Sequence, residues 1–128
     1  MAITVFHRDR PDQMMPMIAS DARLIVWPGT GAETANMNYV RMQPGEENVP
    51  HDHPLSEDTI FVLSGKGTVA DLSNGEVLEF HEGQVIHVPP GVRHQVRGDR
   101  GAEIVSVGGP CPADRALLST AGLLPSDP

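Results

Sequence analysis

Residues 51–65 read HDHPLSEDTIFVLSG, a stretch that combines potential metal ligands with the start of a β-strand. On a strand, residues i and i+2 point to the same face, so His51 and His53 project together. Two imidazoles beside a carboxylate are a common way to hold a divalent transition metal. Two adjacent acids follow, Glu57 and Asp58. Because neighbouring strand residues face opposite sides, only one of these acids can join the histidines.

The sequence around this stretch is a series of short strands separated by turns. From residue 36 onward, turn signals recur every 8 to 12 residues, a spacing typical of a sandwich or barrel. The strongest is Asn74-Gly75, because a two-residue hairpin needs positive φ at both central positions. Strands are predicted within residues 36–42, 59–63, 67–72, 76–80, 84–88, 94–97 and 103–108. The predicted fold class is therefore all-β.

The two ends of the chain differ from this middle. Residues 1–35 are interpreted as an N-terminal arm that packs on the barrel or on a partner, with one strand-like segment, RLIVW, at 23–27. The run ADRALLSTAGLL at 113–124 is typical of a short helix. We therefore predict one domain, with a barrel over 36–110 and a helix and tail over 111–128.

Composition restricts the partners and the compartment. The 128 residues include 17 acids against 9 Lys plus Arg, for a formal charge of −8. Such a surface repels phosphate backbones, so we expect no nucleic-acid partner. No apolar run approaches the roughly 20 residues that span a bilayer, and the N-terminus lacks a signal-peptide core, so we expect no membrane partner. The single cysteine, Cys111, excludes an internal disulfide and fits a cytoplasmic location.

The spacing of residues 45–98 resembles the two sequence motifs of the cupin superfamily. The first motif, a glycine, two histidines, an acid and a glycine, is found at Gly45, His51, His53, residue 57 or 58, and Gly65. The second is found at Gly83, Pro89, Gly91 and His94, with Gly98 in the place where Asn is usual. The resemblance implies a single cupin-type double-stranded β-helix, or jelly-roll, barrel, which agrees with the strand pattern.

The motif also bears on the choice between the two acids. The motif places six residues between the acid and the second glycine, and this spacing from Gly65 gives Asp58 rather than Glu57. Asp58 shares its face with Ile60 and Val62, which would line an apolar interior. We choose Asp58, and Glu57 is the alternative if the preceding loop bulges.

The predicted ligand set is His51, His53, Asp58 and His94. It leaves up to two open positions on one divalent transition metal ion per chain. Mixed nitrogen and oxygen ligands suit Fe, Mn, Ni, Co or Zn, and the ligand types alone do not separate these metals.

Further residues are candidates for the pocket. His87 or Glu57 would act as a general base if either side chain reaches the metal site, although a structural role is favoured for His87. The candidate substrate-binding residues are Tyr39, Arg41, Gln43, Ile60, Val62 and Val96. Alternation allows only one set of side chains from the strand at 36–42 to face inward, and surface solvation is favoured for Arg41.

Fold alone does not determine function in this superfamily. The resemblance implies a metal-dependent enzyme that acts on a small oxygenated organic molecule, by dioxygenase, isomerase or lyase-type chemistry. The alternative is a non-catalytic barrel that binds or senses a small ligand. Short strands leave exposed edges, and the segment ITVFH at 3–7 and the terminal helix are available to cover them. A homodimer is therefore predicted.

Overall fold

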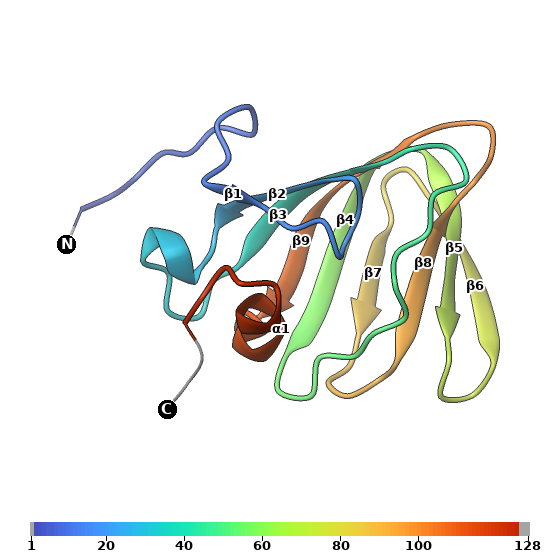
Figure 1. The fold of residues 1–128 in the computed structure, drawn as a ribbon. Helices are drawn as coiled ribbons and strands as arrows, with labels where there is room; N and C mark the ends of the chain where they lie inside the picture. The colour runs from blue at the N-terminus through green and yellow to red at the C-terminus, as the bar shows by residue number, and fades with distance from the viewer. Residues whose placement is uncertain (1, 126–128) are drawn as a thin grey trace.

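Glycine-containing turns divide the chain into short antiparallel strands. The structure, a computed structural model, describes residues 2–125 (Figure 1). Its strands are β1 (Gln13–Met14), β2 (Asp21–Val26), β3 (Met37–Met42), β4 (Glu57–Ser64), β5 (Lys66–Asp71), β6 (Glu76–His81), β7 (Val85–Val88), β8 (His94–Gly98) and β9 (Ile104–Cys111). A 3-10 turn spans Pro28–Thr30, and helix α1 spans Arg115–Thr120. The all-β prediction is confirmed.

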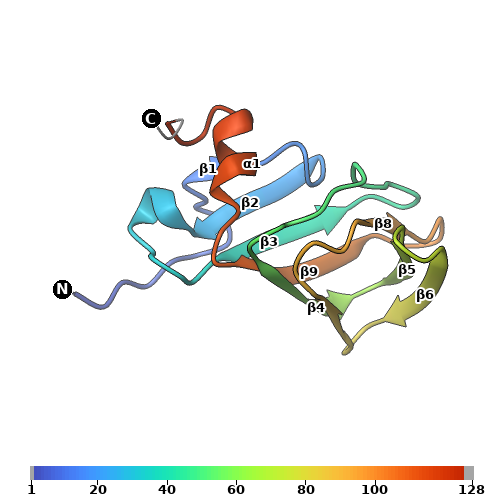
Figure 2. The same cartoon turned by 90° about the horizontal axis from the view of Figure 1, so that it is seen from below.

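The strands form two sheets that enclose an interior. The larger sheet has the order β1-β2-β3-β9-β4-β7, and the smaller has the order β6-β5-β8. Figure 2 shows β5, β6 and β8 facing the curved larger sheet. This double-sheet arrangement is the predicted jelly-roll barrel.

Strand β4 shows how alternation builds the interior. Asp58 and Val62 are buried, and Val62 is fully inaccessible to solvent. Odd-numbered residues of β4, such as Phe61 and Leu63, face outward, and each of these two is 42 % exposed. Because strand side chains alternate between faces, one strand supplies both a buried carboxylate and the apolar wall beside it.

Gly65 allows a tight approach where β4 turns into β5. Its φ is +91°, and a Cβ placed there would lie 2.3 Å from the Glu103 carbonyl oxygen. A larger residue would therefore meet both backbone strain and a collision with backbone. This contact explains the glycine at the end of the first motif.

The ends of the chain depart in part from the sequence expectations. Within the predicted arm, β1 and β2 continue the larger sheet, with β2 paired to β3. Helix α1 is shorter than the predicted run at 113–124. Residues 3–7 form no strand, and they extend away from the sheets (Figure 1). The described residues contain no helix that is long and apolar enough to cross a membrane.

Candidate metal centre

Three histidines converge where the loop before β4 meets the start of β8. A backbone bridge joins His51 to His94, whose N–H groups donate to each other's carbonyl oxygens at 3.1 and 2.8 Å. His53 lies two residues further along, so its ring shares the same side. The ring centroid of His51 lies 4.8 Å from the ring centroid of His53 and 4.4 Å from that of His94. The barrel thus brings together residues from both sequence motifs.

Each histidine is held through Nδ1. His51 Nδ1 donates to the Val49 carbonyl oxygen at 2.6 Å, and His94 Nδ1 donates to the Val92 carbonyl oxygen at 2.9 Å. A carbonyl cannot donate, so Nδ1 carries the proton in both rings and the lone pair lies on Nε2. His53 Nδ1 lies 2.9 Å from Asp114 Oδ2. A carboxylate acceptor imposes the same tautomer on His53.

Asp58 completes the cluster from β4. Its Oδ2 lies 3.6 Å from His53 Nε2 and 3.7 Å from His94 Nε2. Burial raises the pKa of this carboxyl, but the hydrogen bonds and positive charge of the two histidines outweigh burial and bring the pKa to about 2. Asp58 is therefore ionised at neutral pH.

The surroundings of His51 and His53 shift the pKa values of these two histidines in opposite directions. Burial lowers the pKa of His51, as do the neighbouring His94 and His53, so its ring favours the neutral form. Burial also disfavours charge on His53, but the carboxylates of Asp58 and Asp114 prevail and raise its pKa above 6.5. Protons would thus compete with a metal ion more strongly at His53 than at His51.

These four side chains fit a divalent transition metal. One ligand atom from each of them lies within 4.8 Å of all the others. The Nε2 lone pairs are available, and Asp58 Oδ1 is buried without a hydrogen-bond partner among the described residues. A buried carboxylate oxygen without a donor is costly, and a cation would stabilise it. Neutral imidazoles with an ionised carboxylate form a donor set typical of such metals.

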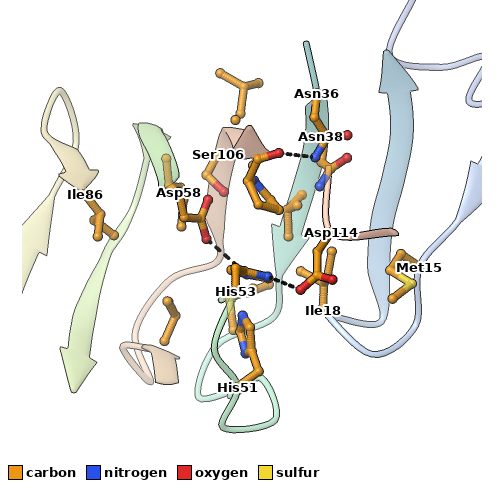
Figure 3. A pocket seen from close by; sticks show the side chains of 18 of the residues that line it. Met15, Ile18, Asn36, Asn38, His51, His53, Asp58, Ile86, Ser106 and Asp114 are labelled. Atoms are coloured by element: carbon orange, nitrogen blue, oxygen red, sulfur yellow. Dashed lines mark hydrogen bonds and ion pairs between the residues drawn. The ribbon is translucent and has the colours of Figure 1, made fainter. Parts of the chain in front are cut away.

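An apolar cavity of about 80 Å³ adjoins the cluster (Figure 3). Its wall includes Ile60, Val62 and Val96, together with Leu117 and Leu118 from the C-terminal helix. Both sheets therefore contribute, and α1 closes one side. The walls would keep water away from a bound ligand, which strengthens electrostatic interactions inside.

The comparisons with known proteins agree with this architecture. A family model described as "Cupin domain" matches residues 38–108, more than half of the chain. The chain belongs to the cupin family. The polyketide cyclase RemF from Streptomyces resistomycificus superimposes with a TM-score of 0.72 at 19 % identity, covering 86 % of this chain and 80 % of RemF. At that identity the likeness shows the fold.

Curated relatives of this cupin differ in their named activities. "Polyketide synthase CurC" from Streptomyces cyaneus is 36 % identical over 88 residues, which cover 66 % of this chain and 56 % of the relative. "Oxalate oxidase 1" from Hordeum vulgare is 32 % identical over 74 residues, covering 53 % of this chain and 37 % of the relative. The cupin thus matches less than two thirds of the length of either relative.

The structure divides the predicted substrate-binding residues into two groups. Ile60, Val62 and Val96 line the cavity, whereas Tyr39, Arg41 and Gln43 do not. Alternation along β3 turns Val40 and Met42 inward instead. The Arg23 guanidinium lies 5.1 Å from the Tyr39 ring centroid, and Arg41 pairs with Glu103. These partners hold Tyr39 and Arg41 on the other face of the sheet.

The two expected general bases also lie outside the metal cavity. Glu57 and His87 face outward from β4 and β7, where His87 Nε2 lies 2.5 Å from Glu57 Oε1. Their side chains are 59 % and 51 % exposed. His87 lines a separate groove of about 440 Å³ between β7 and the smaller sheet, and His94 also contributes to that groove. Alternation thus places Asp58 inside and Glu57 outside.

Sequence reasoning missed four polar residues of the cavity: Asn36, Asn38, Ser106 and Asp114. Asn36 directly precedes β3, Asn38 lies within β3, Ser106 lies in β9, and Asp114 caps the N-terminus of α1. The spacing of the asparagines, i and i+2, was visible in the sequence and places both on one face. The contact of Asp114 with His53 bridges 61 residues, and no local pattern encodes it.

Proposed function

We propose that this cupin is a metal-dependent enzyme that acts on a small, largely apolar, oxygenated organic molecule. The observation that carries the proposal is the convergence of His51, His53, Asp58 and His94 at the edge of an apolar cavity. The three Nε2 lone pairs and the Asp58 carboxylate are the groups that would hold the ion. When bound, a divalent metal polarises a substrate oxygen and acidifies the neighbouring C–H bond.

The protein supplies position and environment to this chemistry. Carbonyl and carboxylate acceptors at Nδ1 fix the ring of each histidine. Asp58 has a pKa of about 2, which makes it a weak base and suits it to the role of ligand. The cavity walls exclude water from the reacting oxygen.

The cavity lining supports a substrate of polyketide type over oxalate. Oxalate is a small dianion, and protein sites for such anions generally use Arg or Lys. Among the described residues that line the cavity there is no Arg or Lys, and most are apolar. An oxygenated aromatic or polyketide-like molecule matches these walls, in keeping with the names of CurC and RemF.

One observation favours a second candidate, a non-catalytic small-ligand-binding barrel. Outside the four proposed ligands, Asp114 is the sole titratable residue among the described residues of the cavity lining. Its Oδ2 contacts His53, and its Oδ1 accepts from the Leu117 N–H. An enzyme that moves a proton needs a free titratable group near the reacting atom, whereas a binder does not.

Elemental analysis combined with a proton-exchange assay separates the two candidates. We expect the purified protein to carry a transition metal and to speed exchange of the α-protons of acetophenone in D₂O, followed by NMR. Chelation and His51→Ala should abolish the rate increase, and His81→Ala should retain it because His81 is an exposed residue at the end of β6. Bound metal without exchange would support the binding barrel, and absence of metal would refute the enzyme.

We also propose that the cupin is a homodimer. Ile3 and Val5 are 98 % and 91 % exposed in a single chain, and residues 3–7 pair with no described strand. An exposed β-branched segment of this kind is suited to covering a strand edge of a partner subunit. Sedimentation at micromolar concentration should give a dimer for the full chain and a monomer after removal of residues 1–7. A monomeric full chain would contradict the proposal.

A further inference from the structure

Two buried asparagines face the cavity with carbonyl oxygens that lack donors. Asn36 and Asn38 are 9 % and 4 % exposed, and both line the cavity beside the metal centre (Figure 3). The Oδ1 atom of each is buried without a hydrogen-bond partner among the described residues. Buried polar atoms are nearly always paired, so two unpaired acceptors side by side indicate a partner from outside the chain.

The fold orients the amide of Asn36 and makes room for both asparagines. Asn36 Nδ2 donates to the Pro110 carbonyl oxygen at 2.9 Å, which fixes the amide with Oδ1 as the free atom. A Cβ at Gly109 would lie 2.9 Å from Asn38 Nδ2 and 3.1 Å from Asn36 Nδ2. The glycine therefore leaves the space in which both amides sit.

A third buried asparagine shows how the same fold treats a structural amide. Asn48 is 8 % exposed, and its Oδ1 accepts from the Val96 N–H at 2.9 Å. It does not line the cavity. The chain therefore satisfies a buried asparagine oxygen where the role is structural, and leaves the oxygens of Asn36 and Asn38 open where they face the cavity.

We propose that Asn36 and Asn38 form a ligand subsite that accepts hydrogen bonds from the hydroxyl group of a phenol or enol. The subsite rests on the proposed function, since both use the same cavity, and it narrows the ligand class to molecules with a donor hydroxyl. The aliphatic wall contacts the apolar body of the ligand.

The register of the strands places this subsite relative to the metal centre. β9 lies between β3 and β4, with Asn38 opposite Gly108 and Asp58 opposite Pro110. Two strand spacings, roughly 10 Å, therefore separate the backbones that carry Asn38 and Asp58. A ligand that reaches from the asparagines to the metal centre therefore spans the width of the intervening strand β9.

The size of the cavity also limits the ligand. Its volume is about 80 Å³, compared with the roughly 150 Å³ of an engineered cavity that binds benzene. A ring therefore needs a small displacement of the wall on entry. Leu117 and Leu118 lie on α1, a helix of six residues that closes one side of the cavity.

The test compares phenol with toluene, which have the same shape and differ in the hydroxyl. Calorimetry with metal-free, chelator-treated protein should give a phenol Kd about 10-fold below that of toluene, as one hydrogen bond to a buried acceptor provides. Asn38→Leu should remove most of this preference. Asn74→Leu, at the exposed β5–β6 hairpin, should retain it.

Two controls keep the test decisive. If Asn38→Leu does not fold, Asn38→Val, which is smaller and suited to a strand, takes its place. Equal binding of phenol and toluene by the wild type, no binding of phenol up to its solubility, or an unchanged preference in the variant would each overturn the subsite. Because the protein is metal-free, this result is independent of whether the metal centre is active.

Discussion

The two faces of β4 each carry an acid paired with histidine, yet only the inner face builds a candidate metal site. Inside, Asp58 contacts His53 and His94 at 3.6 and 3.7 Å, and its side chain is 6 % exposed. Outside, Glu57 lies only 2.5 Å from His87, but both side chains are more than half exposed. The acids are sequence neighbours, and the alternation of the strand separates them.

The comparison shows that burial, and not separation, determines what such a pair can do. Water screens the outer pair, so an interaction of that type contributes about 0–1 kcal/mol to stability. The inner cluster is shielded from water, and there the longer contacts suffice to lower the pKa of Asp58 to about 2. A buried ionised carboxylate with one free oxygen attracts a cation strongly, whereas an exposed one does not.

The largest expected effect comes from removing Asp58, with removal of Glu57 as the matched control. Asp58→Ala should weaken Co²⁺ binding by at least about 100-fold, since loss of outer partners of metal ligands alone costs 10 to 100-fold. Glu57→Ala should leave it unchanged. Titration of the metal-free protein, followed by the visible absorption of Co²⁺, measures both. If Glu57→Ala lost Co²⁺ binding and Asp58→Ala retained it, Glu57 rather than Asp58 would be the metal ligand.

A smaller effect is expected at Asp114, which supports the inner face from α1. Asp114→Ser keeps an N-cap residue for the helix, but the shorter side chain cannot reach His53 Nδ1. We expect Co²⁺ affinity to fall by about 10 to 100-fold. Asp52→Ser is the matched control. It changes an acid whose side chain is 40 % exposed, in the loop that carries His53. Equal affinities of Asp114→Ser and wild type would show that the contact does not position His53.

Metal affinity should also depend on pH. The pKa of His53 is raised above 6.5, so at lower pH its Nε2 carries a proton that the metal must displace. Asp58 remains ionised, because its pKa is about 2. Affinity should therefore fall by about 10-fold per pH unit for each proton displaced as pH drops from 7.5 to 5.5. A flat profile over this range would mean that His53 does not bind the metal.

The smallest effect is expected on the outer face. Glu57→Gln should change the free energy of unfolding by less than about 1 kcal/mol, because the pair with His87 is exposed. Urea unfolding at low and at high salt measures this, and the difference between wild type and variant should shrink as salt screens the pair. A loss above 2 kcal/mol would show that the outer pair is structural.

Much of the fold was accessible from the sequence because its causes are local. Turn glycines such as Gly65 and Gly75, together with the alternation of short apolar segments, predicted strands that correspond to β3 through β9. The motif spacing identified the residues that the structure brings together as a cluster. Alternation along β4 also predicted that Asp58 and Glu57 lie on opposite faces of the strand.

Other features depended on long-range contacts. Nothing near Tyr39 or Arg41 in the sequence states which side of β3 faces inward, since that follows from pairing with β9. Strand β2 joins the sheet by pairing with β3, and β1 pairs with β2, although their own sequence suggested only one strand-like segment.

The sequence by itself determined the strand class, the turn positions and the chemistry of the candidate ligands, because residue type and period-two alternation are local properties. Only the tertiary structure decided which polar groups lose water. It buried Asp58 and the two asparagines, brought Asp114 to His53 across 61 residues, and left Glu57 and His87 in solvent. Burial depends on elements far apart in the chain, and it converts an acid beside a histidine into a candidate site.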